Sequence, residues 1–429
     1  MIIRRAKFVE LILTLSILAG CSSDKVTSPI VTDPQPTLVD VAYCAASAPA
    51  WVAFQDGNGA WAQAQPQLVG NHVVFRHPFT NDRGAVATAR DFANGLTTLD
   101  VEYGVPTELA TVGDTNPVHC GALVSKTLLG SVSGLGANDV ANVMAGFGTR
   151  DLAYPAQGNS FSLPGLASGP QDILATLITQ ENGANVLSRI ILRRSLEQPD
   201  STTLPVLDFA SNEAFAPAVS NVTIGGLGPE GAHLLTLLNT PYSRNQISFL
   251  SNSASAATRA FYAVPQARLR EGDTQVLNVT ASPTVGSLIR SAAVYFRSPV
   301  DQTLTLGAPA TVPAFSTVAT TPSLRLRAIF DRQQDYDRLT SVTYQQGLNT
   351  VVSVSMTSTY ADLTATGYDL VVPDLAGVQG FQPRWALRPG TAVSWIVSRI
   401  GGTLGLGPNA VPTDGASFRF SEEVDSFNP

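Results

Sequence analysis

Charged residues, and lysine above all, are scarce in this sequence. Asp, Glu, Lys and Arg make up 14% of the 429 residues, whereas soluble domains average about 25%. The lysines are Lys7, Lys25 and Lys126, and the arginines are scattered singly or in pairs. A protein that binds nucleic acid needs a basic stripe to neutralise phosphates. Because the formal net charge is -7, we expect no nucleic-acid partner.

Motifs that carry catalysis are also absent from the sequence. No histidine begins a His-Glu-x-x-His pair, no Gly-x-Ser-x-Gly elbow occurs, and no lysine follows a phosphate-binding Gly-x-x-x-x-Gly. The glycine-rich run at Gly402, Gly405 and Gly407 is more typical of turns than of a phosphate cradle. We therefore predict that the protein is not an enzyme and carries no cofactor.

Beyond the N-terminus the sequence has no apolar run of the roughly twenty residues that a membrane-spanning helix needs. Hydrophobic residues are nevertheless 44% of the chain and the mean hydropathy is +0.12. Thr, Ser, Val, Gly and Pro fill the space that charge leaves, which favours short strands joined by turns. The predicted fold class is all-β, with several β-sandwich domains in series.

The N-terminus has the pattern of an export signal. Arg4, Arg5 and Lys7 precede the apolar stretch LILTLSIL, and its last residue begins the run Leu18, Ala19, Gly20 and Cys21. These four residues resemble a bacterial lipobox. The resemblance implies cleavage before Cys21, lipidation of its sulfur, and membrane anchoring through that lipid, with palmitate among the acyl groups. Ser22 after the cysteine resembles the signal that sends lipoproteins to the outer membrane.

Composition and the spacing of strand and turn signals divide the rest of the chain into predicted domains. We expect a signal peptide at residues 1–20, a flexible tether at 21–37, a small β module at 38–122, and β-sandwiches at 123–200, 201–322 and 323–429. A weak repeat supports this series, because Val132-Ser-Gly-Leu-Gly136 matches Ile224-Gly-Gly-Leu-Gly228, and each is followed by an alternating apolar stretch. Glu197 to Thr203 is a turn-rich boundary, and Leu204 to Phe209 could already belong to the next sheet, that of residues 201–322.

The first module contains a hairpin signal and a cysteine pair. Asp56-Gly57-Asn58-Gly59 holds an Asn-Gly dipeptide between candidate strands 51–55 and 60–65, a combination typical of tight hairpins. After Cys21 takes its lipid, Cys44 and Cys120 remain near the two ends of the module, and an oxidising compartment favours a disulfide between them. The weaker alternative is a metal site of His119 and Cys120 with His72 or His77, although adjacent strand residues point to opposite faces.

Residues 123–200 resemble the carboxypeptidase regulatory-like, transthyretin-type β-sandwich. The resemblance rests on the segment from Asn159 to Pro170, which ends a strand in a Gly-Leu-x-x-Gly turn before Asp172-Ile-Leu-Ala175. Members of that family mostly serve as rigid spacers or binding modules, so the resemblance implies no catalytic residues. Another Greek-key sandwich with similar turns remains an alternative.

Two clusters in the last domain are candidate binding sites. Asp331, Asp335 and Asp337 offer oxygens of the kind that Ca²⁺ prefers, but the glycine that bends a calcium loop is missing. We weigh them as weak metal candidates against a solvated loop. The aromatics at 368, 381, 385 and 395 could line a sugar or peptide groove, although such residues more often fill a sandwich core.

These patterns predict a lipid-anchored lipoprotein of the outer membrane that acts as a binding or scaffold protein. Its expected partners are the membrane, through the N-terminal lipid, and an envelope protein or a glycan. The sequence does not identify the ligand-binding residues. The alternative function is a glycan-acting or glycan-binding accessory protein, on a β-propeller-like or β-sandwich framework. Asp56 and Trp61 have the spacing of the Asp-box hairpin of sialidase-type propellers, but a plain hairpin fits better.

Overall fold

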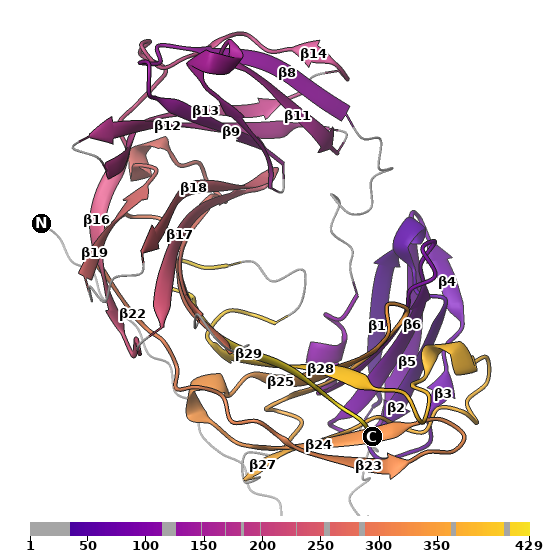
Figure 1. The fold of residues 1–429 in the computed structure, drawn as a ribbon. Coiled ribbons are helices and arrows are strands. Elements are labelled where there is room, and N and C mark those ends of the chain that lie inside the picture. The colour runs from indigo at the N-terminus through magenta and orange to yellow at the C-terminus, as the bar shows by residue number, and fades with distance from the viewer. Residues whose placement is uncertain are drawn as a thin grey trace, which may run out of the picture. The chain divides into compact units, whose positions relative to one another are not determined.

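The structure of the chain is a computed structural model, in which residues 36–429 form one compact unit. It describes residues 35–113, 126–146, 148–167, 169–181, 184–197, 199–228, 230–252, 258–282, 288–361, 366–406 and 412–429. Strands account for 58% of the described residues, which confirms the all-β prediction. Figure 1 shows them following one another from β1 in indigo to β29 in yellow.

The first sandwich covers residues 37–104 and is followed by the short helix α1 (Pro106–Leu109). Its strands are β1 (Thr37–Cys44), β2 (Trp51–Asp56), β3 (Ala62–Gln63), β4 (Pro66–Val69), β5 (His72–Phe79), β6 (Gly84–Asp91) and β7 (Thr97–Gly104). One sheet has the order β1-β5-β4, and the other contains β3-β2-β6-β7. The predicted hairpin is confirmed, because β2 pairs with β3. Gly57 rather than Asn58 takes the positive φ, at +56°.

The second sandwich covers residues 126–208. Its strands are β8 (Lys126–Ser133), β9 (Val140–Ala145), β10 (Thr149–Ala153), β11 (Ser160–Leu166), β12 (Gln171–Glu181), β13 (Ala184–Leu196), β14 (Thr202–Thr203) and β15 (Leu207–Asp208). One sheet has the order β10-β9-β12-β13, and in the other β8 pairs with β11, β14 and β15. The assignment of Leu204 to Phe209 to the next sheet is wrong, because β15 pairs with β8 and the apolar side chains of this segment lie in the core of the second sandwich.

The third sandwich covers residues 218–305. Its strands are β16 (Ala218–Gly225), β17 (Gly231–Thr240), β18 (Ser243–Asn252), β19 (Thr258–Ala263), β20 (Thr274–Ser282), β21 (Ile289–Phe296) and β22 (Gln302–Thr305). The sheets are β19-β16-β22 and β18-β17-β20-β21. This connectivity repeats that of the second sandwich strand for strand, and the matched Val132 and Ile224 lie near the ends of β8 and β16. The weak sequence repeat therefore marks a structural repeat.

The fourth sandwich covers residues 314–427. Its strands are β23 (Ala314–Ala319), β24 (Arg325–Asp331), β25 (Leu339–Gln346), β26 (Thr350–Thr357), β27 (Gly367–Val371), β28 (Val393–Gly402) and β29 (Ser417–Phe427). They form the sheets β23-β24-β27 and β26-β25-β28-β29. The alternation Arg325-Leu326-Arg327 in the sequence predicts a strand with one solvated side. The structure confirms this, because Leu326 is buried and both arginines are partly exposed.

All four sandwiches thus share one connectivity. In each, the second, third, fifth and sixth strands of the shared pattern form a four-stranded sheet, and the first and fourth strands pair in the facing sheet. The fourth differs in one element, because β23 pairs antiparallel with β24 where a seventh strand pairs parallel in the second and third. In the first, β4 adds to the far edge of β5 instead.

Three of the four-stranded sheets join into one twelve-stranded sheet. Strand β21 of the third sandwich pairs antiparallel with β29 of the fourth, over Ile289–Val294. Strand β26 of the fourth pairs in parallel with β7 of the first, from Thr97↔Thr350 to Tyr103↔Met356. The first and last sandwiches are therefore joined by backbone hydrogen bonds although they lie at opposite ends of the sequence.

Hydrophobic clusters also join the sandwiches, in two pairs. Trp51, Leu99 and Val101 of the first sandwich share one core with Leu326 and Tyr344 of the fourth. A second shared core holds Met144, Leu174 and Ile190 of the second sandwich with Leu238 and Val264 of the third. Each of these pairs of sandwiches therefore buries apolar surface jointly as well as within its own layers.

Candidate functional site

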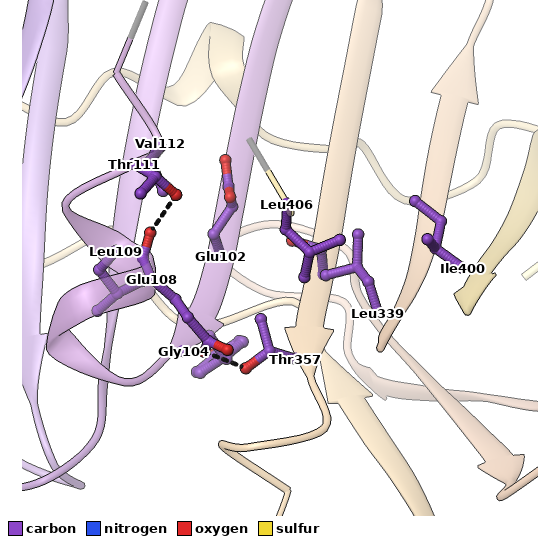
Figure 2. A pocket seen from close by; sticks show the side chains of 12 residues that line it. Glu102, Gly104, Glu108, Leu109, Thr111, Val112, Leu339, Thr357, Ile400 and Leu406 are labelled. Atoms are coloured by element: carbon purple, nitrogen blue, oxygen red, sulfur yellow. Dashed lines mark hydrogen bonds between the residues drawn. The ribbon is translucent and has the colours of Figure 1, made fainter. Parts of the chain in front are cut away.

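A cavity with ionisable walls lies where α1, the first sandwich and the fourth sandwich meet. Its volume is about 160 Å³. Lining it are Glu102, Tyr103, Gly104, Glu108, Leu109, Thr111, Val112, Leu339, Ser355, Thr357, Ile400 and Leu406. Figure 2 shows Glu102 between the α1 residues on one side and Leu339, Leu406 and Ile400 on the other.

Strand alternation places Glu102 in this cavity. Leu99 and Val101 face the core that the first and fourth sandwiches share, so Asp100 and Glu102 project from the opposite face of β7. Glu102 pairs across the sheet with Val86 on β6 and Ser355 on β26. The two acids therefore lie beside α1, on a sheet face that continues from β7 onto β26, β25 and β28 of the fourth sandwich.

Glu108 is fixed at the opposite wall by hydrogen bonds. Its Oε2 accepts from the backbone N–H of Val105 at 3.1 Å, which caps α1, and from Thr357 Oγ1 at 2.7 Å. Thr359 Oγ1 donates to the same carboxylate at 2.6 Å. Pro106 sets the helical φ at the first position of α1. Glu108 thus ties α1 to the end of β26, and its oxygens are already used.

Glu102 has no such partners. Among the residues that the structure describes, none donates a hydrogen bond to its carboxylate, and burial with the nearby Asp100 raises its pKa to about 7. The Arg90 guanidinium opposes that rise. Burial also raises the pKa of Asp100, against hydrogen bonds from Ser353 and Thr98. Glu102 therefore changes its charge near neutral pH, facing a cavity.

Most of the residues predicted for lipidation, for the disulfide and for the alternative metal site lie outside the part of the chain that the structure describes. Leu18, Ala19, Gly20 and Cys21 lie outside the described residues, as do His119 and Cys120. Cys44 ends β1, is 1% exposed and is not a free thiol. The pairing of Cys44 with Cys120 and the lipidation of Cys21 remain predictions.

The aspartates at the end of β24 hold a connecting segment in place. Asp335 Oδ2 accepts from the Ala308 N–H at 3.0 Å, and its Oδ1 lies 3.4 Å from Arg419 Nη1. Gln333 bonds the backbone of Thr311 and Pro309, and Asp331 offers its backbone carbonyl to Arg399. In the described part of the chain, no group of three or more His, Cys, Asp or Glu has metal-binding geometry.

The aromatic residues of the last domain pack inside it. Trp385, Trp395 and Tyr368 are 2%, 4% and 2% exposed in the core shared with the first sandwich, and Phe381 packs against that core. Their side chains fill the sandwich rather than line a groove, which confirms the core interpretation. Within the described residues, no helix is both long and apolar enough to cross a bilayer.

Sequence reasoning did not single out Glu102, Asp100 or Glu108. The alternation in Thr98-Leu-Asp-Val-Glu102 was readable, but it is typical of a strand with one solvated face. The cavity wall beside these acids includes Leu339, Thr357 and Ile400. These residues are more than 200 positions away in the sequence, so no local pattern relates them to Glu102. The chain matches no protein-family model, and comparison with curated proteins finds no relative.

Proposed function

We propose that the protein is a lipid-anchored envelope lipoprotein that serves as a scaffold or binding protein at the outer membrane. The observation that carries the proposal is the lipobox-like Leu18-Ala19-Gly20-Cys21 ahead of four sandwiches of one connectivity. Four joined β-sandwiches suit a scaffold or a display platform, because a rigid framework presents its loops and sheet edges in fixed positions. The resemblance of residues 123–200 to spacer modules supports the same role.

The cysteines support an extracytoplasmic location in a second way. Cys44 is buried and is not a free thiol, and we propose that Cys120 is its disulfide partner. Disulfides persist in oxidising compartments such as the periplasm and the cell surface. The proposed anchor and the proposed disulfide thus require the same side of the inner membrane.

The anchor is tested by metabolic labelling. Cells producing the full chain are grown with labelled palmitate, and the wild-type protein is expected to take up label and to partition into the detergent phase. Cys21→Ala is expected to lose both properties, because no sulfur remains to be lipidated. Cys44→Ala is the matched control and should keep its label. Label retained in Cys21→Ala, or lost in both variants alike, contradicts the proposal.

A further inference from the structure

The cavity at α1 combines apolar walls with the carboxylate of Glu102, to which none of the described residues donates a hydrogen bond. Protein surrounds Glu102, and the surface that this side chain keeps faces the cavity. Across from it lie Leu339, Ile400 and Leu406 (Figure 2). A carboxylate held in a largely apolar space is costly unless something pairs with it. The cavity therefore has one polar requirement that the described residues leave unmet.

The charges around Glu102 are unbalanced. Asp100 on β7 and Glu108 on α1 carry negative charge, while Arg90 on β6 is the basic group that acts on Glu102. Tyr43 on β1 also faces this group, and the Arg90 guanidinium lies 5.2 Å from the centre of the Tyr43 ring. Strands β25, β26 and β28 contribute apolar or hydroxyl side chains to the lining. Three acids against one arginine make the site attractive to a cation.

The walls restrict which cation fits. A divalent metal wants six or more oxygen ligands, and Glu108 already spends its oxygens on Thr357, Thr359 and the Val105 N–H. The volume of about 160 Å³ is close to the roughly 150 Å³ of an apolar cavity that accepts benzene. A compact hydrocarbon body with one ammonium group matches both the walls and the single open carboxylate.

We propose that this cavity binds a small organic ammonium ion, whose charged nitrogen pairs with Glu102 and whose apolar body contacts Leu339, Ile400 and Leu406. The ligand class is an alkyl- or cycloalkylammonium of about six carbons, the size set by the benzene comparison. The site is independent of the lipid anchor, since none of its residues takes part in lipidation.

Cyclohexylamine is the probe, with cyclohexanol as its neutral counterpart of the same shape. Titration calorimetry on the purified full chain should show cyclohexylamine binding about tenfold more weakly at pH 6 than at pH 8, because a carboxyl of pKa about 7 is mostly protonated at the lower pH. At pH 7 binding should release about half a proton, detected as a binding enthalpy that changes with the ionisation enthalpy of the buffer. Cyclohexanol should bind at least tenfold more weakly at pH 8.

Two variants and a control separate the charge from the cavity. Glu102→Gln should lose at least about tenfold in affinity and all of the pH dependence. Ile400→Phe keeps the carboxylate but fills the space, and should also abolish binding. Glu271→Gln removes an acid from an exposed turn of the third sandwich and should bind like the wild type. No measurable binding, equal affinity for cyclohexanol, or unchanged affinity in Glu102→Gln overturns the proposal.

Discussion

A buried group of three charged side chains links the second sandwich to the third. Arg194 on β13 donates to Asp172 at 3.0 Å and to Asp273, which precedes β20, at 2.5 Å. The three side chains are 7%, 2% and 1% exposed. Asp172 also accepts from the Ser195 N–H, and Asp273 from the Arg270 N–H. Every charge in this group therefore has a partner, as burial requires.

Arg194→Met is expected to destabilise the protein by about 3–5 kcal/mol, because it leaves two buried carboxylates without their cation. Arg76→Met is the control, since Arg76 and Asp40 form an ion pair with both side chains about 40% exposed, for which a loss below about 1 kcal/mol is expected. Urea unfolding followed by circular dichroism measures both. Equal losses in the two variants would show that the buried group is not a special contact.

The raised pKa of Glu102 makes the free energy of unfolding depend on pH. Its folded pKa of about 7 lies above the ordinary 4.5, so the folded state binds the proton more tightly than the unfolded state does. The stability contribution of this group is therefore greatest at low pH and is lost as the pH rises from about 4.5 through 7. Above that window the ionised carboxylate opposes folding.

Glu102→Gln should accordingly be more stable than the wild type at pH 8, by up to about 3 kcal/mol for a shift of this size. The advantage should shrink as the pH falls and vanish well below pH 4.5, where the wild-type side chain is protonated in both states. The difference between the two unfolding free energies, measured by urea titration at each pH, isolates this group from the other acids. A difference that stays constant with pH would contradict the assignment of the pKa.

At the scale of elements, local pattern was enough to find strands and turns. Alternation at Arg325-Leu-Arg327 and the Asn-Gly signal both correspond to observed elements. The predicted strand at residues 60–65 shortens to Ala62–Gln63. The parallel pairing of β26 with β7 was not foreseen, because it joins residues about 250 positions apart and neither strand signals its partner.

The same limit explains why the acidic cavity was missed. The local sequence around Asp100 and Glu102 is typical of a solvated strand face. Only the packing of α1 and the fourth sandwich around them shows that these acids are enclosed. The aspartates at 331, 335 and 337 were noticed because they cluster in sequence. In the structure Asp335 accepts hydrogen bonds from the Ala308 N–H and from Arg419. Proximity in the sequence therefore singles out the aspartates after β24, whereas the cavity at Glu102 is assembled from segments that are far apart in the sequence.

One close approach between elements gives a further prediction. The short 3-10 turn η4 (Gln334–Tyr336) crosses β28 at Gly401, where a Cβ would lie 2.0 Å from the Asp335 carbonyl oxygen. Gly401→Ala must push this turn away and is expected to cost about 1–3 kcal/mol. Gly377→Ala is the control, since no atom lies within 4 Å of the added Cβ there. Thermal unfolding that ranks the two variants equally would count against this packing.

For the whole molecule, the shared cores define two pairs of sandwiches. The first and fourth share one hydrophobic cluster and the second and third another. Between the third and fourth, the described residues show sheet pairing of β21 with β29 but no common hydrophobic cluster. Because apolar burial is the dominant favourable term in folding, we expect the sandwiches that share a core to unfold together and the chain to unfold as two units.

All four tryptophans report on one of these units. Trp51, Trp385 and Trp395 belong to the core shared by the first and fourth sandwiches, and Trp61 packs against it. Arg194→Met acts at the other pair, so it should lower the unfolding midpoint seen by circular dichroism and leave the tryptophan-fluorescence midpoint in place. Gly401→Ala should lower the fluorescence midpoint. If Arg194→Met shifts both probes together, the twelve-stranded sheet couples all four sandwiches into one cooperative unit, because pairing of β21 with β29 then transmits stability as strongly as a shared core does.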